Sequence, residues 1–171
     1  QSAVCTGGRH RAGRTPAGSR PRPDTVRARG GVTNMAHVVV LGAGLGGMPM
    51  AFEMRELARR DDKVTVVSNS PRFHFVPSNP WVAVNWRTRQ DIELDLGAAL
   101  QRKGIDFVPV GAARVHPAEN RIELDDGNSI GYDFLVIATG PKLAFDEIPG
   151  LGPAASGGHT QSICHVDHAV E

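Results

Sequence analysis

Apolar residues in this chain come in short continuous runs that alternate with stretches of helical spacing. The runs at 38–41, 64–67 and 134–138 have the length and continuity of strands buried on both faces of a parallel sheet. Between the first two runs, apolar side chains recur at helical spacing and predict a helix over 46–60, at Met50, Met54, Leu57 and Ala58. The alternation of strands and helices predicts an α/β domain built on a parallel sheet.

The stretches between these elements carry weaker patterns. Residues 70–90 contain aromatic residues and prolines without a regular period, and we expect a long structured loop there. A helix is expected over 95–103, ended by Gly104, because glycine accepts the left-handed conformation just past a helix C-terminus. The other expected elements are a strand over 105–110, antiparallel strands at 114–116 and 121–124, a turn at Asp126-Gly127, a loop-rich stretch over 141–162 and a helix that starts near Ser162.

Residues 1–34 differ from the rest of the chain, and we predict a disordered, arginine-rich tail there. The segment has almost nothing to bury, and Asp24 is its one acidic residue. An organelle transit peptide and upstream sequence foreign to the natural protein both fit this composition. The second is favoured, because Met35 resembles a natural start followed at once by a strand. The domain is therefore predicted over 35–171.

Composition and charge exclude several other classes of protein. The net charge is +1, so the chain as a whole shows no bias toward nucleic acid, and no nucleic-acid motif occurs. Cys5 and Cys164 lie far apart in the sequence and predict neither a disulfide framework nor a metal site. No apolar run reaches the ~18–20 residues that cross a bilayer, and residues 1–34 lack the apolar segment of a secretory signal.

A glycine fingerprint, Gly42-x-Gly44-x-x-Gly47, follows the first strand and opens the first helix. In that context the pattern predicts a dinucleotide-binding βαβ unit rather than a glycine-rich turn without a ligand. Gly42 permits a tight turn, Gly44 lets the backbone approach a pyrophosphate, and Gly47 lets the helix pack closely on the strand. The helix N-terminus then presents N–H groups and a positive dipole end to the phosphates.

The position after the second strand lacks the acidic residue that usually binds a ribose hydroxyl in such folds. Ser68 and Asn69 stand there instead, and either side chain offers polar atoms to a ribose hydroxyl. The strand that runs into Thr139 and Gly140 resembles the two-dinucleotide-binding-domain flavoproteins, in which this turn comes close to FAD. Together these features favour FAD over NAD as the ligand.

Longer strings narrow the resemblance to one family. Those at 75–81, 138–145 and 161–169, with the fingerprint region, resemble the N-terminal part of bacterial sulfide:quinone oxidoreductase, and flavocytochrome c sulfide dehydrogenases share the general plan. The resemblance covers about 35–171 and implies a Rossmann-like FAD-binding domain. It also implies a set of residues that line FAD: Gly42, Ala43, Gly44, Leu45, Gly46, Gly47, Ser68, Asn69, Val76, Ala112, Thr139 and Gly140.

The same resemblance implies a redox role for Cys164 and a role in proton movement for His168. Members of that family oxidise sulfide to polysulfide or sulfur beside FAD and pass the electrons to membrane quinone. Such chemistry needs a thiolate or disulfide sulfur as the site of attack. If the segment is helical, the two side chains share one face, and a protonated imidazole there favours thiolate. From residue type alone, a small buried cysteine and a helix histidine without function stay open.

The resembled family is more than twice as long as this chain, and the departures matter. This sequence holds no second glycine fingerprint and no partner cysteine for Cys164, and its end falls inside an expected helix. We therefore expect a truncated N-terminal fragment that alone binds FAD weakly or not at all and has no turnover. By resemblance, the full-length protein is peripheral to the bacterial inner membrane. The alternatives are a type II NADH:quinone dehydrogenase-like flavoprotein and a non-catalytic nucleotide-binding fragment.

Overall fold

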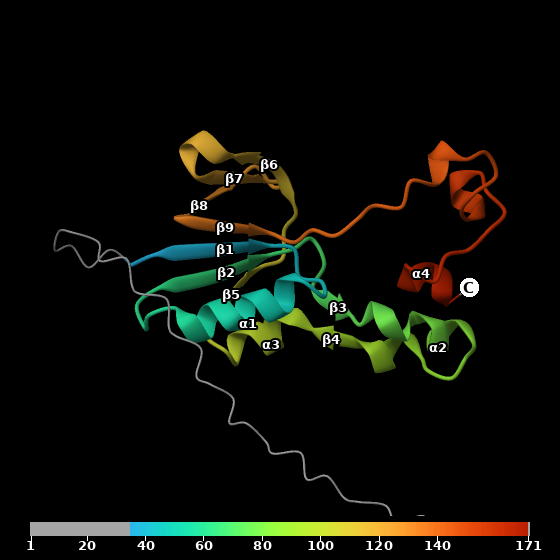
Figure 1. The fold of residues 1–171 in the computed structure, drawn as a ribbon, viewed down its shortest axis with the longest axis horizontal. Coiled ribbons are helices and arrows are strands. Elements are labelled where there is room, and N and C mark those ends of the chain that lie inside the picture. Colours follow the sequence, from blue (N-terminus) through green and yellow to red (C-terminus); the bar gives the residue numbers. More distant parts are fainter. Residues whose placement is uncertain (1–34, 171) are drawn as a thin grey trace, which may run out of the picture. The chain divides into compact units, whose positions relative to one another are not determined.

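The structure is a computed structural model that describes residues 35–170, so the tail predicted over 1–34 lies outside the described residues. A parallel sheet in the order β5-β2-β1-β9 forms the centre of the domain (Figure 1). Its strands are β1 (His37–Leu41), β2 (Lys63–Val67), β5 (Asp106–Val108) and β9 (Phe134–Ile137). The predicted α/β class and the three predicted apolar strands are thereby confirmed.

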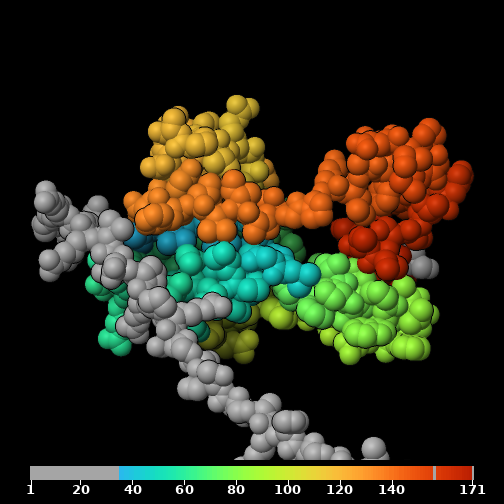
Figure 2. Space-filling model, viewed as in Figure 1, coloured from blue at the N-terminus to red at the C-terminus, as the bar shows by residue number. Residues whose placement is uncertain are grey.

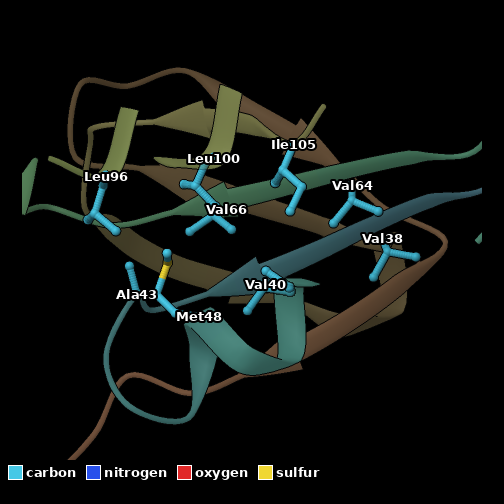
Figure 3. Close-up of a cluster of buried hydrophobic side chains, with 10 residues drawn as sticks. Val38, Val40, Ala43, Met48, Val64, Val66, Leu96, Leu100 and Ile105 are labelled. Carbon is cyan, nitrogen blue, oxygen red and sulfur yellow. The ribbon is translucent and has the colours of Figure 1, made fainter. Parts of the chain in front are cut away.

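The sheet is buried on both faces at its centre, where side chains along β1 alternate between two separate cores. Val38 and Val40 pack into one core, whereas Val39 and Leu41 pack into the other. Helices α1 (Gly47–Leu57) and α3 (Leu96–Gln101) cover the first face (Figures 1 and 3). The second face is covered by an antiparallel sheet of β6 (Ala112–His116), β7 (Arg121–Leu124) and β8 (Ser129–Gly131).

Helix α1 confirms the predicted helix but spans Gly47–Leu57 rather than 46–60. The face that packs on the sheet carries Met48 and Ala51. Leu57, one of the positions predicted from apolar spacing, is 75% exposed. Met54 and Ala58, two other positions of that spacing, do pack against the core. The spacing therefore identified the helix and part of its buried face.

The prediction of a long loop over 70–90 is wrong, because this stretch holds regular elements. They are β3 (Arg72–His74), which pairs with β4 (Glu93–Asp95), a 3-10 turn at Val76–Ser78, α2 (Asn79–Ala83) and the start of a second 3-10 turn at Arg89–Ile92. Each is only a few residues long, and prolines interrupt them, so no hydrophobic period marks them in the sequence.

Helix α3 confirms the predicted helix over 95–103 but is shorter, because it begins at Leu96 and already ends at Gln101. The Asp95 carboxylate accepts a hydrogen bond from the Ala98 N–H (2.8 Å) and caps the helix, and Gly104 beyond its C-terminus has φ +67°. The stretch 141–162 is loop-rich as expected, with short 3-10 turns at Phe145–Glu147 and Ala154–Ser156.

The last helix, α4 (Val166–Ala169), begins later than the expected start near Ser162. It packs against α2, and Val82, Ile92, Val166 and Ala169 form a small buried cluster there. Figure 2 shows these two segments, green and red, in contact. Within residues 35–170, no helix combines the length and apolar content needed to span a bilayer.

Candidate functional site

The glycine fingerprint forms a tight turn between β1 and α1, and steric contacts explain two of its glycines. Gly42 has φ +101°, and a Cβ on it would lie 2.3 Å from the carbonyl oxygen of Ala138 at the end of β9. A Cβ on Gly47 would lie 1.9 Å from the Gly42 carbonyl oxygen. The Gly42 N–H donates to the Val67 carbonyl oxygen (2.8 Å) at the end of β2. The turn is therefore held against both neighbouring strands, and a larger residue does not fit.

Gly44 differs from these two glycines because its surroundings are open. No atom lies within 4 Å of the position that a Cβ on it would take, and the residue forms part of a cleft wall. Helix α1 begins just beyond, at Gly47, with no acidic residue in its first turn and no side-chain cap. A helix N-terminus carries partial positive charge and N–H groups without helical partners, so this arrangement suits a phosphate group.

The cleft has a volume of about 420 Å³ and lies at the carboxyl ends of β1 and β2. Ligands of open α/β sheets bind at this edge. Most of the predicted FAD-lining residues meet on its wall: Gly42, Ala43, Gly44, Ser68, Asn69, Val76, Ala112 and Thr139. The structure thus brings segments that are far apart in sequence around one space.

The other predicted residues, Leu45, Gly46, Gly47 and Gly140, are not on the wall of this cleft. Gly47 is buried against the fingerprint turn, and Gly140 has φ +74° in the turn after β9. Leu45 instead lines a second, mostly apolar cavity beside α1 and β3. In this structure these residues shape the turns around the cleft.

Several other residues of the wall were not predicted as site residues: Leu41, Val67, Ser70, His74, Gly111 and Asp125. The most informative pair is Gly111, directly before β6, and Asp125, directly after β7. These two positions lie side by side because the strands are antiparallel. A Cβ on Gly111 would lie 2.0 Å from Asp125 Oδ2 and 3.3 Å from Asn69 Cβ, so a side chain at this position would displace the carboxylate from where it lies. A glycine directly before β6 was the one available signal, and no local motif connects it with Asp125.

Cys164 and His168 lie away from this wall, on the segment that leads into α4. Cys164 is exposed and precedes the helix, so the expected helical face shared with His168 does not form. Its exposure also excludes a small buried cysteine. The ring of His168 lies 5.5 Å from that of Phe145 and 5.4 Å from that of His165, between centroids. His168 Nδ1 is buried and has no hydrogen-bond partner among the described residues.

A fully buried asparagine on α2 anchors the segment that carries Cys164. Asn79 Nδ2 donates to the carbonyl oxygen of Ile163 (2.8 Å), 84 positions further along the chain, and the Asn79 residue is 0% exposed. Ile163 directly precedes Cys164, so this hydrogen bond determines where the cysteine lies relative to α2.

A chain of charged side chains connects the cleft wall with α4. His74 on the wall pairs with Glu93 (Nε2 to Oε1, 2.8 Å), and the Arg89 guanidinium contacts both Glu93 and Asp167. Burial raises the pKa of Glu93, but hydrogen bonds from Arg89 and His74 outweigh it and hold the pKa below its ordinary value. The hydrogen bond from Arg89 lowers the pKa of Asp167. Both carboxylates are therefore ionised at neutral pH.

Comparison with known proteins places this arrangement in a family. A family model described as pyridine nucleotide-disulphide oxidoreductase matches residues 36–171. The chain belongs to that family. The predicted fold class, a Rossmann-like FAD-binding domain of the two-dinucleotide-binding-domain type, is confirmed.

The relatives include a sulfide-quinone reductase. The chain is 39% identical over 135 residues to the sulfide-quinone reductase of Aquifex aeolicus, which covers 79% of this chain and 30% of that protein. The X-ray structure of the sulfide:quinone oxidoreductase from Aquifex aeolicus matches with a TM-score of 0.71 and 38% identity, over 79% of this chain and 30% of that one. The resemblance inferred from the sequence is confirmed.

A second kind of relative is named as NADH dehydrogenase-like. An NADH dehydrogenase-like protein of Mycobacterium tuberculosis is 31% identical over 124 residues, which cover 68% of this chain and 30% of that protein. The chain thus spans about 30% of the length of these relatives.

The residues of the cleft fit FAD, the cofactor of this fold. The open space at Gly44 and the N-terminus of α1 suit a pyrophosphate, and the polar side chains of Ser68 and Asn69 stand where the adenosine ribose binds in such folds.

Proposed function

We propose that this chain is the FAD-binding N-terminal part of a bacterial sulfide:quinone oxidoreductase, which oxidises sulfide to polysulfide or sulfur and passes the electrons to quinone. The observation that carries the proposal is the cleft around the Gly44 turn, in a chain 39% identical to the sulfide-quinone reductase of Aquifex aeolicus. Peripheral contact with the bacterial inner membrane, where quinone dissolves, belongs to the same proposal.

FAD would extend along the cleft wall. Gly42, Ala43 and Gly44 bring backbone to the pyrophosphate, and the polar groups of Ser68 and Asn69 face the adenosine ribose. The other residues assigned to the site are Val76, Ala112 and Thr139 on the wall, and Leu45, Gly46, Gly47 and Gly140 in the adjoining turns. When bound, FAD supplies an acceptor for the electron pair released by sulfide.

Cys164 is the residue that we assign to the sulfur chemistry. Its thiol is free and the residue is exposed, so sulfide can reach Sγ. The sulfide sulfur loses an electron pair as it joins sulfur held on the enzyme, the electrons are delivered to quinone, and the released protons balance quinol formation. We assign proton movement to His168, whose Nδ1 has no partner among the described residues.

A second candidate function is that of an NADH dehydrogenase-like flavoprotein. The 31% identity to the Mycobacterium tuberculosis protein favours it, although this is below the 39% to the sulfide-quinone reductase. Ser68 and Asn69 in place of an acidic residue, and the segment around Cys164, favour sulfide as the electron donor. A third candidate is a non-catalytic nucleotide-binding fragment, which would bind FAD but turn over no donor.

The test measures reduction of decylubiquinone by the gene product that contains this sequence, with sulfide or NADH as donor. We expect turnover with sulfide, its loss in Cys164→Ser, and its retention in Cys5→Ser, the matched cysteine control. Turnover with NADH alone would support the second candidate, and flavin binding without turnover would support the third. Either outcome would overturn the proposal.

A further inference from the structure

An acidic side chain reaches the end of β2 from another part of the chain, although the usual acidic residue is absent there. Asp125 lies in the turn after β7 and lines the cleft. The position that a Cβ on Gly111 would take lies close to both segments. It is 2.0 Å from Asp125 Oδ2 and 3.3 Å from Asn69 Cβ. Asp125 and the end of β2 therefore meet at one corner of the cleft.

The Asp125 carboxylate is available to a ligand. It makes no hydrogen bond or ion pair with any other described residue, while its backbone N–H donates to the Gly111 carbonyl oxygen (2.9 Å) and fixes the turn. The next residue, Asp126, is used differently, because its carboxylate accepts hydrogen bonds from the backbone N–H and the side chain of Asn128. Of these two neighbouring acids, one stabilises the turn and the other faces the cleft.

We propose that Asp125 accepts a hydrogen bond from a ribose hydroxyl in the adenosine half of FAD. An ionised carboxylate only accepts hydrogen bonds, and ribose hydroxyls donate them. In other dinucleotide-binding folds a carboxylate at the end of the second strand has this role. Here the carboxylate comes from the turn between β7 and β8, and Gly111 provides the room for it. The inference rests on the proposed FAD site. It adds a residue that determines the specificity of that site for the ribose hydroxyl.

The test compares the affinities of the flavin-free gene product that contains this sequence for ADP, 2′-deoxy-ADP and 3′-deoxy-ADP by titration calorimetry. We expect wild type to favour ADP over at least one deoxy analogue by roughly tenfold, since a hydrogen bond to a charged group carries about that much discrimination. Asp125→Ala should abolish this preference. Asp61→Ala is the matched control, because Asp61 is exposed and precedes β2, at the opposite end of that strand. Asp125→Asn preserves the shape of the side chain. It checks that a lost preference for ADP over the deoxy analogues does not result from unfolding of the variant.

Three outcomes would overturn the inference. Wild type would bind ADP and both deoxy analogues equally, or Asp125→Ala would retain the preference. Alternatively, Asp125→Ala would change the ratio of ADP to inosine diphosphate instead, which would mean that the carboxylate binds the exocyclic amine of the base. If wild type binds neither ADP nor FAD, the nucleotide site itself fails and the proposed function falls with it, whereas normal binding without an effect of Asp125 removes the inference alone.

Discussion

Alanine substitutions at Gly47 and Gly44 should separate the stability of the fingerprint turn from its capacity to bind a ligand. A Cβ on Gly47 would lie 1.9 Å from the Gly42 carbonyl oxygen, so the helix must move away from the turn. Overpacking of this kind costs about 1–3 kcal/mol, and better helix propensity returns less than about 1 kcal/mol. We expect Gly47→Ala to lower the free energy of unfolding by about 2 kcal/mol, from a total of roughly 5–15 kcal/mol.

Gly44→Ala is the contrasting change. No atom lies within 4 Å of the new methyl group, and Gly44 is not among the glycines with positive φ, so stability should change by less than about 0.5 kcal/mol. The methyl group projects toward the cleft, where the pyrophosphate would approach the backbone. We therefore expect roughly tenfold or greater loss of affinity for ADP, since each 1.4 kcal/mol of lost binding free energy is a factor of ten.

Urea denaturation measures the first effect and titration calorimetry with ADP the second. Gly131→Ala in β8 serves as the control for both, because its Cβ would meet only the Asn120 carbonyl oxygen, at 3.9 Å. The reasoning is refuted if Gly44→Ala and Gly47→Ala lose equal stability. It is also refuted if Gly44→Ala binds ADP as wild type does.

The ion pairs of Arg89 and the buried side chain of Asn79 lead to further predictions. Arg89→Gln should lower the free energy of unfolding by about 1 kcal/mol in urea denaturation at pH 7, because Glu93 and Asp167 lose a charged donor; an unchanged midpoint would contradict this. The folded-state pKa values of Glu93 and Asp167 are lowered, so their contribution is complete above the ordinary carboxyl pKa and is lost as pH falls below it. The difference between wild type and Arg89→Gln should accordingly shrink below about pH 4, and a constant difference down to about pH 3 would refute the pairing. Asn79→Leu should cost about 1–3 kcal/mol and speed hydrogen exchange in α4, because the Ile163 carbonyl loses its buried donor; slow exchange in the variant would show that the hydrogen bond does not hold α4.

The central strands were predictable because burial on both faces leaves only apolar residues acceptable along them. That requirement is local, so the run at 38–41 marks β1 directly. The run at 134–138 also marks its strand, although Phe134 and Ile137 at the two ends of β9 are exposed. The elements within 70–90 were not predictable in this way. β3 exists because it pairs with β4, and α2 is stabilised by α4, so their partners lie outside any local window.

The candidate site likewise has a part that could be predicted from the sequence and a part that could not. The residues assigned from the fingerprint and from the ends of β2 and β9 meet on one cleft wall, because parallel strands end at the same edge of the sheet. The expected helical face for Cys164 and His168 did not form, because α4 begins only at Val166. Spacing alone does not reveal where so short a helix starts.

By itself, the sequence determined the βαβ unit and its glycine turn, since the conformation of Gly42 and the close contact with Gly47 arise within a few consecutive residues. Only the tertiary structure decided what faces the cleft and what holds the cysteine segment. Asp125 reaches the end of β2 through the folding of a separate sheet, and the Asn79 side chain holds a carbonyl group 84 positions away. Contacts between such distant residues depend on the packing of whole layers, and packing leaves no periodic pattern in the sequence.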